Sequence, residues 1–220
     1  IEESDLYIKA ESLLYDKAFE RLRRTRCEIE EYIYKNRRFA DSLTPVKCAA
    51  HAPEIIRKMC RAAEEAGVGP MAAVAGAVAE ELAYYLHQCS GEVIVENGGD
   101  VFIINRRPMR IGIYTEDDLL SMKLGLELMP YPEGISICTS SGRIGHSLSF
   151  GRADAVTVLA PSGAYADAAA TAVANMIQSE ADIDAALDFA QSKKAILGVV
   201  VVINNKIGVK GEIIKLCALD

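Results

Sequence analysis

Helical and strand patterns follow one another in blocks along this chain instead of alternating one by one. Apolar residues at helical spacing predict helices over 11–38, 53–66, 70–88, 163–178 and 180–192. Strand patterns occur over 5–10, 92–96, 101–105, 109–113, 154–160, 196–203, 206–209 and 212–216, with two short strands around a turn in 121–139. Because a βαβ series would alternate them, the block order predicts an α+β fold. With no linker and no repeat, residues 1–220 are expected to form one domain.

The charge balance excludes nucleic acid as a partner attracted by overall electrostatics. The chain has 24 basic and 31 acidic residues, a formal net charge of −7, and a polyanion is repelled by such a protein. Basic side chains are dense between Lys17 and Arg38, but acidic residues are mixed among them. This segment is therefore interpreted as the solvated face of an amphipathic helix.

Neither a membrane span nor an apolar signal core is visible. The longest aliphatic run, 195–203, is far shorter than the roughly 20 residues that a membrane-crossing helix needs. The six cysteines form no CxxC pair and no tight cluster. They are interpreted as separate reduced thiols, which favours a cytoplasmic protein.

The first candidate site is the segment Asn97-Gly98-Gly99-Asp100 between two apolar strands. Asn-Gly is a strong signal for a tight hairpin. The same glycines would let backbone N–H groups approach a phosphate or a ring, with Asp100 as an anchor. Both interpretations remain open from the residues alone.

The second candidate follows a predicted strand and concentrates hydroxyls, glycines and charge. It contains Thr139, Ser140, Ser141, Gly142, Arg143 and His146. Such a loop could donate hydrogen bonds to an anion, with Arg143 supplying charge and His146 carrying a proton near neutral pH. A polar surface loop and a hydrolase that uses Ser140 or Ser141 with His146 are the alternatives.

The third candidate is the pair Asp167 and Thr171, spaced i and i+4 on a predicted helix. Their oxygens share one helix face, and a carboxylate with a hydroxyl suits a hard cation such as Mg²⁺. The structural alternative is an acidic residue near a helix N-terminus and a threonine bonded back to the helix backbone. The alanines around the pair predict that this helix lies tightly against another element.

Taken in order, these segments resemble the ApbE superfamily, the FAD:protein FMN transferases once called thiamine biosynthesis lipoproteins. The resemblance runs through residues 69–175 and includes the strand 155–158 and the alanine-rich segment 166–172. Segments 69–80 and 95–100 are similar to an uncharacterised prokaryotic ApbE-like family. The resemblance implies a T-fold-like duplication, with two intertwined halves, mixed or antiparallel sheets, packed helices and a cleft for a flavin dinucleotide.

The resemblance also implies roles for individual residues. Asp167 and Thr171 would hold Mg²⁺, residues 98–100 would line the flavin site, and His146 would lie near the reacting phosphate. The ion would bridge the phosphates of FAD while a Ser or Thr hydroxyl of an acceptor protein attacks the phosphate of the FMN half. AMP would leave, which is ordinary phosphoryl-transfer logic.

Two departures from the transferases leave a second function open. Their Lys-Gly-Tyr segment is matched here by Ala75-Gly76-Ala77, without the lysine, and the residues after His146 also differ. The alternative is a flavin-binding or assembly protein without transferase activity. The alanine-rich segment 70–79 could also pack against a second copy of the chain, as a homo-oligomer.

Overall fold

The computed structural model describes residues 4–115, 123–142, 150–211 and 215–219. Six α-helices lie in this part of the chain: α1 (Tyr15–Lys35), α2 (Arg37–Asp41), α3 (Glu54–Ala66), α4 (Val74–His87), α5 (Gly163–Asn175) and α6 (Ile183–Ser192). A 3₁₀ turn, Pro70–Ala73, precedes α4, and another, Glu180–Asp182, precedes α6. The predicted helices are confirmed, although 11–38 is divided between α1 and α2.

Ten strands form two sheets in the described residues. They are β1 (Leu6–Ala10), β2 (Val93–Asn97), β3 (Asp100–Asn105), β4 (Met109–Gly112), β5 (Leu124–Leu128), β6 (Tyr131–Ser140), β7 (Ala155–Ala160), β8 (Gly198–Ile203), β9 (Lys206–Gly211) and β10 (Leu216–Ala218). The large sheet has the order β1-β2-β3-β6-β7-β8-β9, and the small one has the order β10-β5-β4. Neighbouring strands are antiparallel throughout, so the α+β class is confirmed. The second strand predicted in 121–139 is longer than expected, since β6 spans 10 residues.

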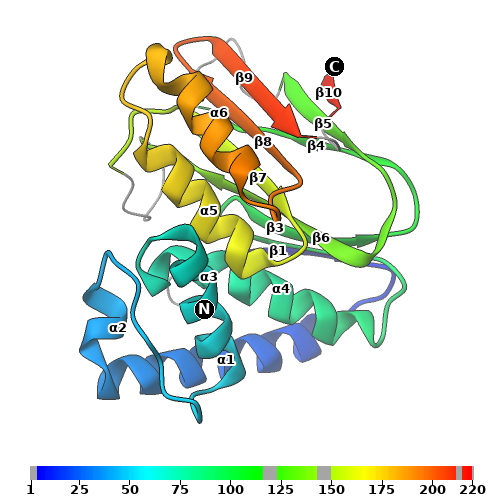
Figure 1. The fold of residues 1–220 in the computed structure, drawn as a ribbon. Helices are drawn as coiled ribbons and strands as arrows, with labels where there is room; N and C mark the ends of the chain where they lie inside the picture. The colour runs from blue at the N-terminus through cyan, green and yellow to red at the C-terminus, as the bar shows by residue number, and fades with distance from the viewer. Residues whose placement is uncertain (1–3, 116–122, 143–149, 212–214, 220) are drawn as a thin grey trace.

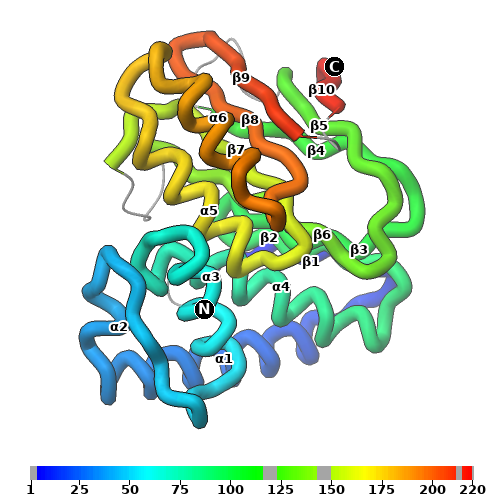
Figure 2. Tube along the Cα trace, in the orientation of Figure 1, coloured from blue at the N-terminus to red at the C-terminus, as the bar shows by residue number. Residues whose placement is uncertain are grey.

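The elements are arranged in layers (Figure 1, Figure 2). Helices α4, α5 and α6 contact one face of the large sheet, and α1 and α3 contact this helix layer from the other side. The small sheet covers the opposite face through a second apolar cluster that includes Ile103, Leu126 and Val200. The central strands β3, β6, β7 and β8 therefore present alternate side chains to the helices and to the small sheet.

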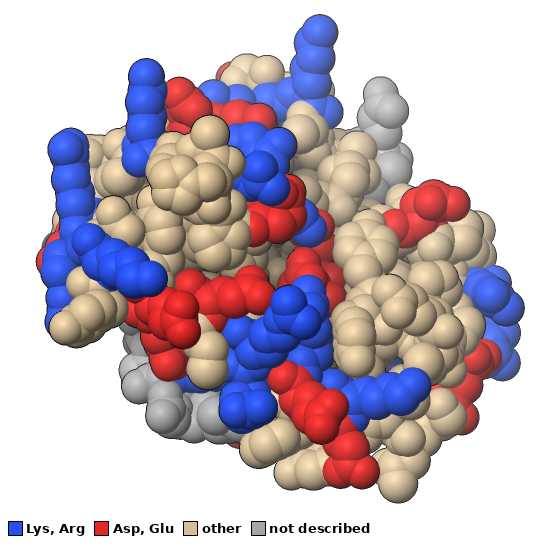
Figure 3. Space-filling model, turned by 90° about the horizontal axis from the view of Figure 1, so that it is seen from below, with Lys and Arg blue, Asp and Glu red and all other residues tan. Residues whose placement is uncertain are grey.

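The basic segment of α1 carries mixed charge, as predicted. Arg24 pairs with Glu28 and Arg26 pairs with Glu30, each one helical turn apart. On the face seen in Figure 3, lysine and arginine side chains alternate with acidic ones and form no continuous basic surface. This distribution agrees with a solvated helix face.

All six cysteines are free thiols, as expected. Within the described residues, no helix has the length and apolar character needed to cross a membrane. The cytoplasmic location stays a prediction.

Candidate functional site

The alanine- and glycine-rich segments predicted to lie against something lie against each other, as α4 and α5. A Cβ atom added to Gly76 would stand 2.2 Å from the carbonyl oxygen of Gly163, and one added to Gly163 would stand 2.2 Å from that of Gly76. Only glycine at both positions lets the two backbones approach this closely. The partner of segment 70–79 is thus another part of the same chain.

Each of these two helices binds the first turn of the other through an acidic side chain. The Gly76 N–H donates to Asp167 Oδ2 at 2.9 Å, and the Gly163 N–H donates to Glu80 Oε2 at 2.7 Å. Free N–H groups at a helix N-terminus favour such carboxylates. The symmetry is visible in the sequence, because Gly76-Ala-Val-Ala-Glu80 and Gly163-Ala-Tyr-Ala-Asp167 share one pattern. The sequence analysis missed this short repeat, and with it Glu80.

A buried polar cluster lies beneath this helix pair, on the helix-facing side of β3 and β6. Asp100 begins β3, and the pairing of Val101 with Ile137 places Asp100 beside Cys138 on β6. Ser140 follows two residues later on the same face. Helix α5, which contacts β6, carries Asp167 and Thr171. All four side chains, Asp100, Ser140, Asp167 and Thr171, are less than 9% exposed. The fold thus brings Asp167 and Thr171 of the third candidate to the same region as Asp100 of the first and Ser140 of the second.

The Asn97–Asp100 segment is a tight hairpin, which settles its local structure. Gly98 and Gly99 have φ angles of 64° and 98°, the left-handed conformations that this two-residue turn requires. Asn97 Nδ2 donates to the carbonyl oxygen of Ala75 at 3.2 Å and so ties the hairpin to the first turn of α4. A Cβ atom at either glycine would meet no atom within 4 Å, so space outside the hairpin is open to a ligand.

The described part of the second candidate, residues 139–142, faces both sides of the sheet. Thr139 points to the opposite side of the sheet, where its hydroxyl bonds that of Thr157 at 2.9 Å, while Ser140 faces the buried cluster. Ser141 is hydrogen-bonded or otherwise partnered. The Gly142 N–H donates to the carbonyl oxygen of Ala153 at 3.0 Å. Arg143 and His146 lie outside the described residues.

The two carboxyl groups of the cluster disfavour ionisation. Burial raises the pKa of Asp100 to about 7, although the Cys138 thiol and the Thr139 N–H oppose this change. Burial, and then the charge of Asp100, raise the pKa of Asp167 well above its ordinary value. Burial and both carboxylates raise the pKa of the Cys138 thiol. Without a cation, protonation relieves the repulsion between the carboxylates of Asp100 and Asp167. A cation bound between them would relieve the same repulsion.

Three oxygen atoms of the cluster are buried without a hydrogen-bond partner among the described residues. They are Asp100 Oδ1, Ser140 Oγ and Thr171 Oγ1. Unpaired buried oxygens are costly and rare in native proteins, and an ion or a water is a usual reason for them. Two carboxylates and two hydroxyls are hard oxygen donors, which fit Mg²⁺. Among the described residues, no three His, Cys, Asp or Glu side chains form a metal-binding group, so hydroxyls, water or a ligand would have to complete such a site.

Asp100→Asn should increase stability at alkaline pH in a chelating buffer. Because the folded state raises the pKa of Asp100 to about 7, the folded protein binds the proton more tightly than the unfolded chain. The stability present near pH 4 is therefore lost as the pH rises through 7. At pH 8 we expect the variant to be more stable than the native protein by up to about 4 kcal/mol, with little difference at pH 4. Urea unfolding measures both.

The control is Asp188→Asn, which removes an exposed carboxylate paired with Lys210. It should change the free energy of unfolding by less than about 0.5 kcal/mol at either pH. An Asp100→Asn protein that is less stable than the native one at pH 8 would contradict the assigned direction of the pKa change.

With this geometry established, comparisons with known proteins identify the family. The model of the family described as "AbpE bacteria" matches residues 1–208. The chain belongs to that family. One relative is the UPF0280 protein of Methanocaldococcus jannaschii. It is 42% identical over 226 residues, and the match covers all of this chain and 92% of the relative. The UPF0280 protein of Methanopyrus kandleri is 42% identical over 227 residues, covering all of this chain and 91% of the relative.

The AbpE bacteria member also resembles a solved structure. A variant of the flavin transferase ApbE from Vibrio cholerae superposes with a TM-score of 0.59 over 93% of this chain and 92% of that chain. The two sequences are 16% identical, so this similarity shows the shared fold alone. The predicted resemblance to the ApbE superfamily is confirmed at the level of family and fold.

Proposed function

We propose that this chain binds FAD with a divalent cation at the cluster between α4, α5 and the β3–β6 pair, and transfers FMN to a protein hydroxyl. One observation carries the proposal: among the described residues, Asp100 Oδ1, Ser140 Oγ and Thr171 Oγ1 are buried without a hydrogen-bond partner, and the carboxylates of Asp100 and Asp167 lie close enough to repel each other. Unpaired oxygens beside two acidic groups favour a bound cation over a purely structural cluster.

The residues of the chain would divide the work of the transfer. Asp167 and Thr171 would hold Mg²⁺, which when bound would neutralise charge on the phosphates. The hairpin Asn97–Asp100 and the segment Ser140–Arg143 would contact the flavin nucleotide, whereas Thr139 faces the other side of the sheet. His146 would accept the proton of the acceptor hydroxyl. The new bond joins that hydroxyl oxygen to the phosphorus of the FMN half, the bond between this phosphorus and the bridging oxygen breaks, and AMP carries the bridging oxygen away.

Two findings support this reaction class. The fold is similar to that of a protein named as a flavin transferase, and the family match spans most of the chain. The repeated Gly-Ala-x-Ala-acid pattern supports the further proposal that the chain is one domain built from two intertwined, T-fold-like halves. The flavin nucleotide and the acceptor protein are the partners that follow.

The test incubates the protein with FAD, Mg²⁺ and a flavin-acceptor protein, and measures AMP together with flavin covalently attached to the acceptor. We expect equal amounts of both products, and neither product when a chelator replaces Mg²⁺. Absence of AMP and of covalent flavin, with FAD bound, would refute the transferase. Absence of FAD binding would refute the flavin site itself.

One observation favours the second candidate, a flavin-binding or assembly protein without turnover. Asp167 Oδ2 already accepts the Gly76 N–H, so this residue has a structural function that persists without catalysis. FAD binding measured by flavin fluorescence, without AMP in the same assay, would identify this candidate.

A further inference from the structure

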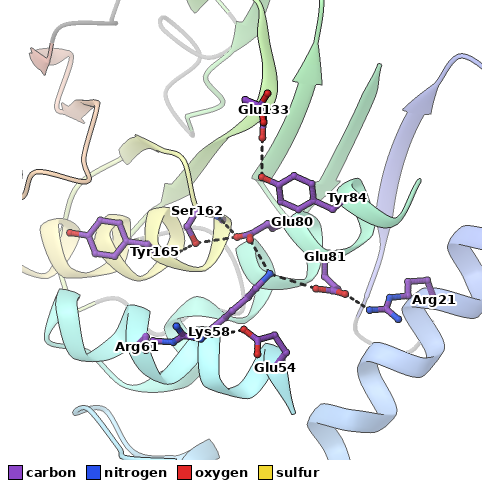
Figure 4. A network of polar contacts seen from close by, with 11 residues as sticks. Arg21, Glu54, Lys58, Arg61, Glu80, Glu81, Tyr84, Glu133, Ser162 and Tyr165 are labelled. Carbon is purple, nitrogen blue, oxygen red and sulfur yellow. Dashed lines mark hydrogen bonds and ion pairs between the residues drawn. The ribbon is translucent and has the colours of Figure 1, made fainter. Parts of the chain in front are cut away.

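Glu80 is the centre of an ion-pair network that joins four helices (Figure 4). Lys58 Nζ on α3 lies 3.1 Å from Glu80 Oε1 and 3.7 Å from Glu81 Oε2. Arg21 on α1 pairs with Glu81. The other oxygen of Glu80 accepts the Gly163 N–H and the Ser162 hydroxyl, at 2.7 and 3.1 Å. A single carboxylate thus connects α3 to the first turn of α5.

Glu80 and Asp167 occupy equivalent positions in the two helices but differ in what neutralises them. Each lies four residues after the contact glycine, and each accepts the N–H of the opposite glycine. The Glu80 side chain is 9% exposed and is paired with Lys58. In the described part of the chain, no lysine, arginine or histidine forms an ion pair with Asp167, and the nearby charge is the carboxylate of Asp100. The ammonium of Lys58 thus neutralises Glu80, whereas Asp167 has no such counter-charge among the described residues.

From this asymmetry we propose that Lys58 and Glu80 are positioning residues for the cation site of α5, an inference that rests on the proposed function. Glu80 holds the N–H of Gly163, the first residue of α5. Asp167 and Thr171 follow one and two turns later on the same rigid helix. A shift of the first turn therefore moves both ligands relative to Asp100 and Ser140.

Lys58 is needed because a buried carboxylate without a counter-charge is strongly disfavoured. Burial lowers the pKa of the Lys58 ammonium, but Glu80 and Glu81 outweigh it and raise the pKa above its usual range. The ammonium therefore stays charged at neutral pH. If it is removed, the Glu80 carboxylate loses its ion pair and turns toward solvent, and the Gly163 N–H is held more weakly.

The test measures Mn²⁺ binding by the loss of the EPR signal of free Mn²⁺, a readout independent of catalysis. We expect the native protein to bind one Mn²⁺ and Lys58→Met to bind it at least 10-fold more weakly. Coulomb's law alone predicts the opposite sign, because removing a positive charge should strengthen cation binding. The double variant Lys58→Met/Glu80→Gln should return to within threefold of native affinity, since the Gln carbonyl still accepts the Gly163 N–H and needs no counter-charge.

The matched control is Lys210→Met, which removes the cation of an exposed ion pair with Asp188 on the far side of α6. It should bind Mn²⁺ like the native protein. A Lys58→Met protein with native or tighter Mn²⁺ affinity, or a double variant as weak as the single one, would overturn the inference.

Hydrogen exchange separates a failure of this inference from a failure of the proposed function. With a chelator present, amides 163–167 should exchange at least 10-fold faster in Lys58→Met than in the native protein and in Lys210→Met. If the native protein binds no Mn²⁺, the cation part of the proposed function is refuted, and exchange alone decides whether the pair positions α5. Unchanged exchange would overturn the positioning role.

Discussion

We expect Gly163→Ala to destabilise the protein by at least about 3 kcal/mol, a large share of the stability of an ordinary domain. The new methyl group would stand 2.2 Å from the carbonyl oxygen of Gly76 and 3.0 Å from Cβ of Glu80. Backbone atoms cannot move aside like a flexible side chain, so α4 and α5 must separate. Separation would break both N–H to carboxylate hydrogen bonds between them. Urea unfolding followed by circular dichroism measures the loss.

Gly67→Ala is the matched control for this variant. Gly67 ends α3 with a φ angle of 80°, but a Cβ atom there would meet no atom within 4 Å. Gly67→Ala should destabilise the protein by only about 1–2 kcal/mol, the cost of placing alanine in a left-handed conformation. If Gly163→Ala cost no more than Gly67→Ala, the close contact of the two helices would be wrong.

Asp167→Asn should weaken binding of a divalent cation by at least 100-fold while leaving the fold intact. The asparagine carbonyl still accepts the N–H of Gly76, so the contact between α5 and α4 persists. The charge that would hold the cation is lost, and so are its burial cost and its repulsion with Asp100, which together raise the pKa of Asp167 in the native protein. In chelating buffer at pH 8 the variant should therefore be at least as stable as the native protein. Mn²⁺ titration and urea unfolding give the two values.

Thr171→Val makes the companion test, because it keeps the side-chain shape and removes one unpartnered oxygen. We expect about 10-fold weaker Mn²⁺ binding and no loss of stability, since Thr171 Oγ1 has no hydrogen-bond partner to lose among the described residues. Asp167→Ala removes both the charge and the acceptor of the Gly76 N–H. It should therefore also destabilise the protein. Native Mn²⁺ affinity in both Asp167→Asn and Thr171→Val would show that this pair holds no cation.

Local patterns predicted most of the elements because their signals are short-range. Gly67 ends α3 in the left-handed conformation, Ser162 accepts the Tyr165 N–H at the start of α5, and Asn204 and Asn205 form the turn between β8 and β9 with positive φ angles. Each of these features depends on the conformational preference of one or two residues. The helix and strand order, and with it the α+β class, followed from such signals.

The candidate site was only partly predictable from the residues. The i, i+4 spacing placed Asp167 and Thr171 on one helix face, and the Asn-Gly signal placed Asp100 at the end of a hairpin. Their meeting with Ser140 depends on the β3–β6 register and on how deeply α5 packs on β6. Lys58 carried no signal, because its contact with Glu80 joins residues 22 positions apart.

By itself the sequence determined the elements, the α+β class, the acidic charge and the resemblance to one superfamily, because these depend on local preference and composition. The tertiary structure decided which alanine-rich helix lies against which, and which acidic group receives a lysine. The first depends on the close approach of two backbones that only glycine at Gly76 and Gly163 allows, and the second on where α3 places Lys58. Lys58 neutralises Glu80, whereas the charge near Asp167 is that of Asp100, and the proposed positioning role of Lys58 and Glu80 rests on this asymmetry.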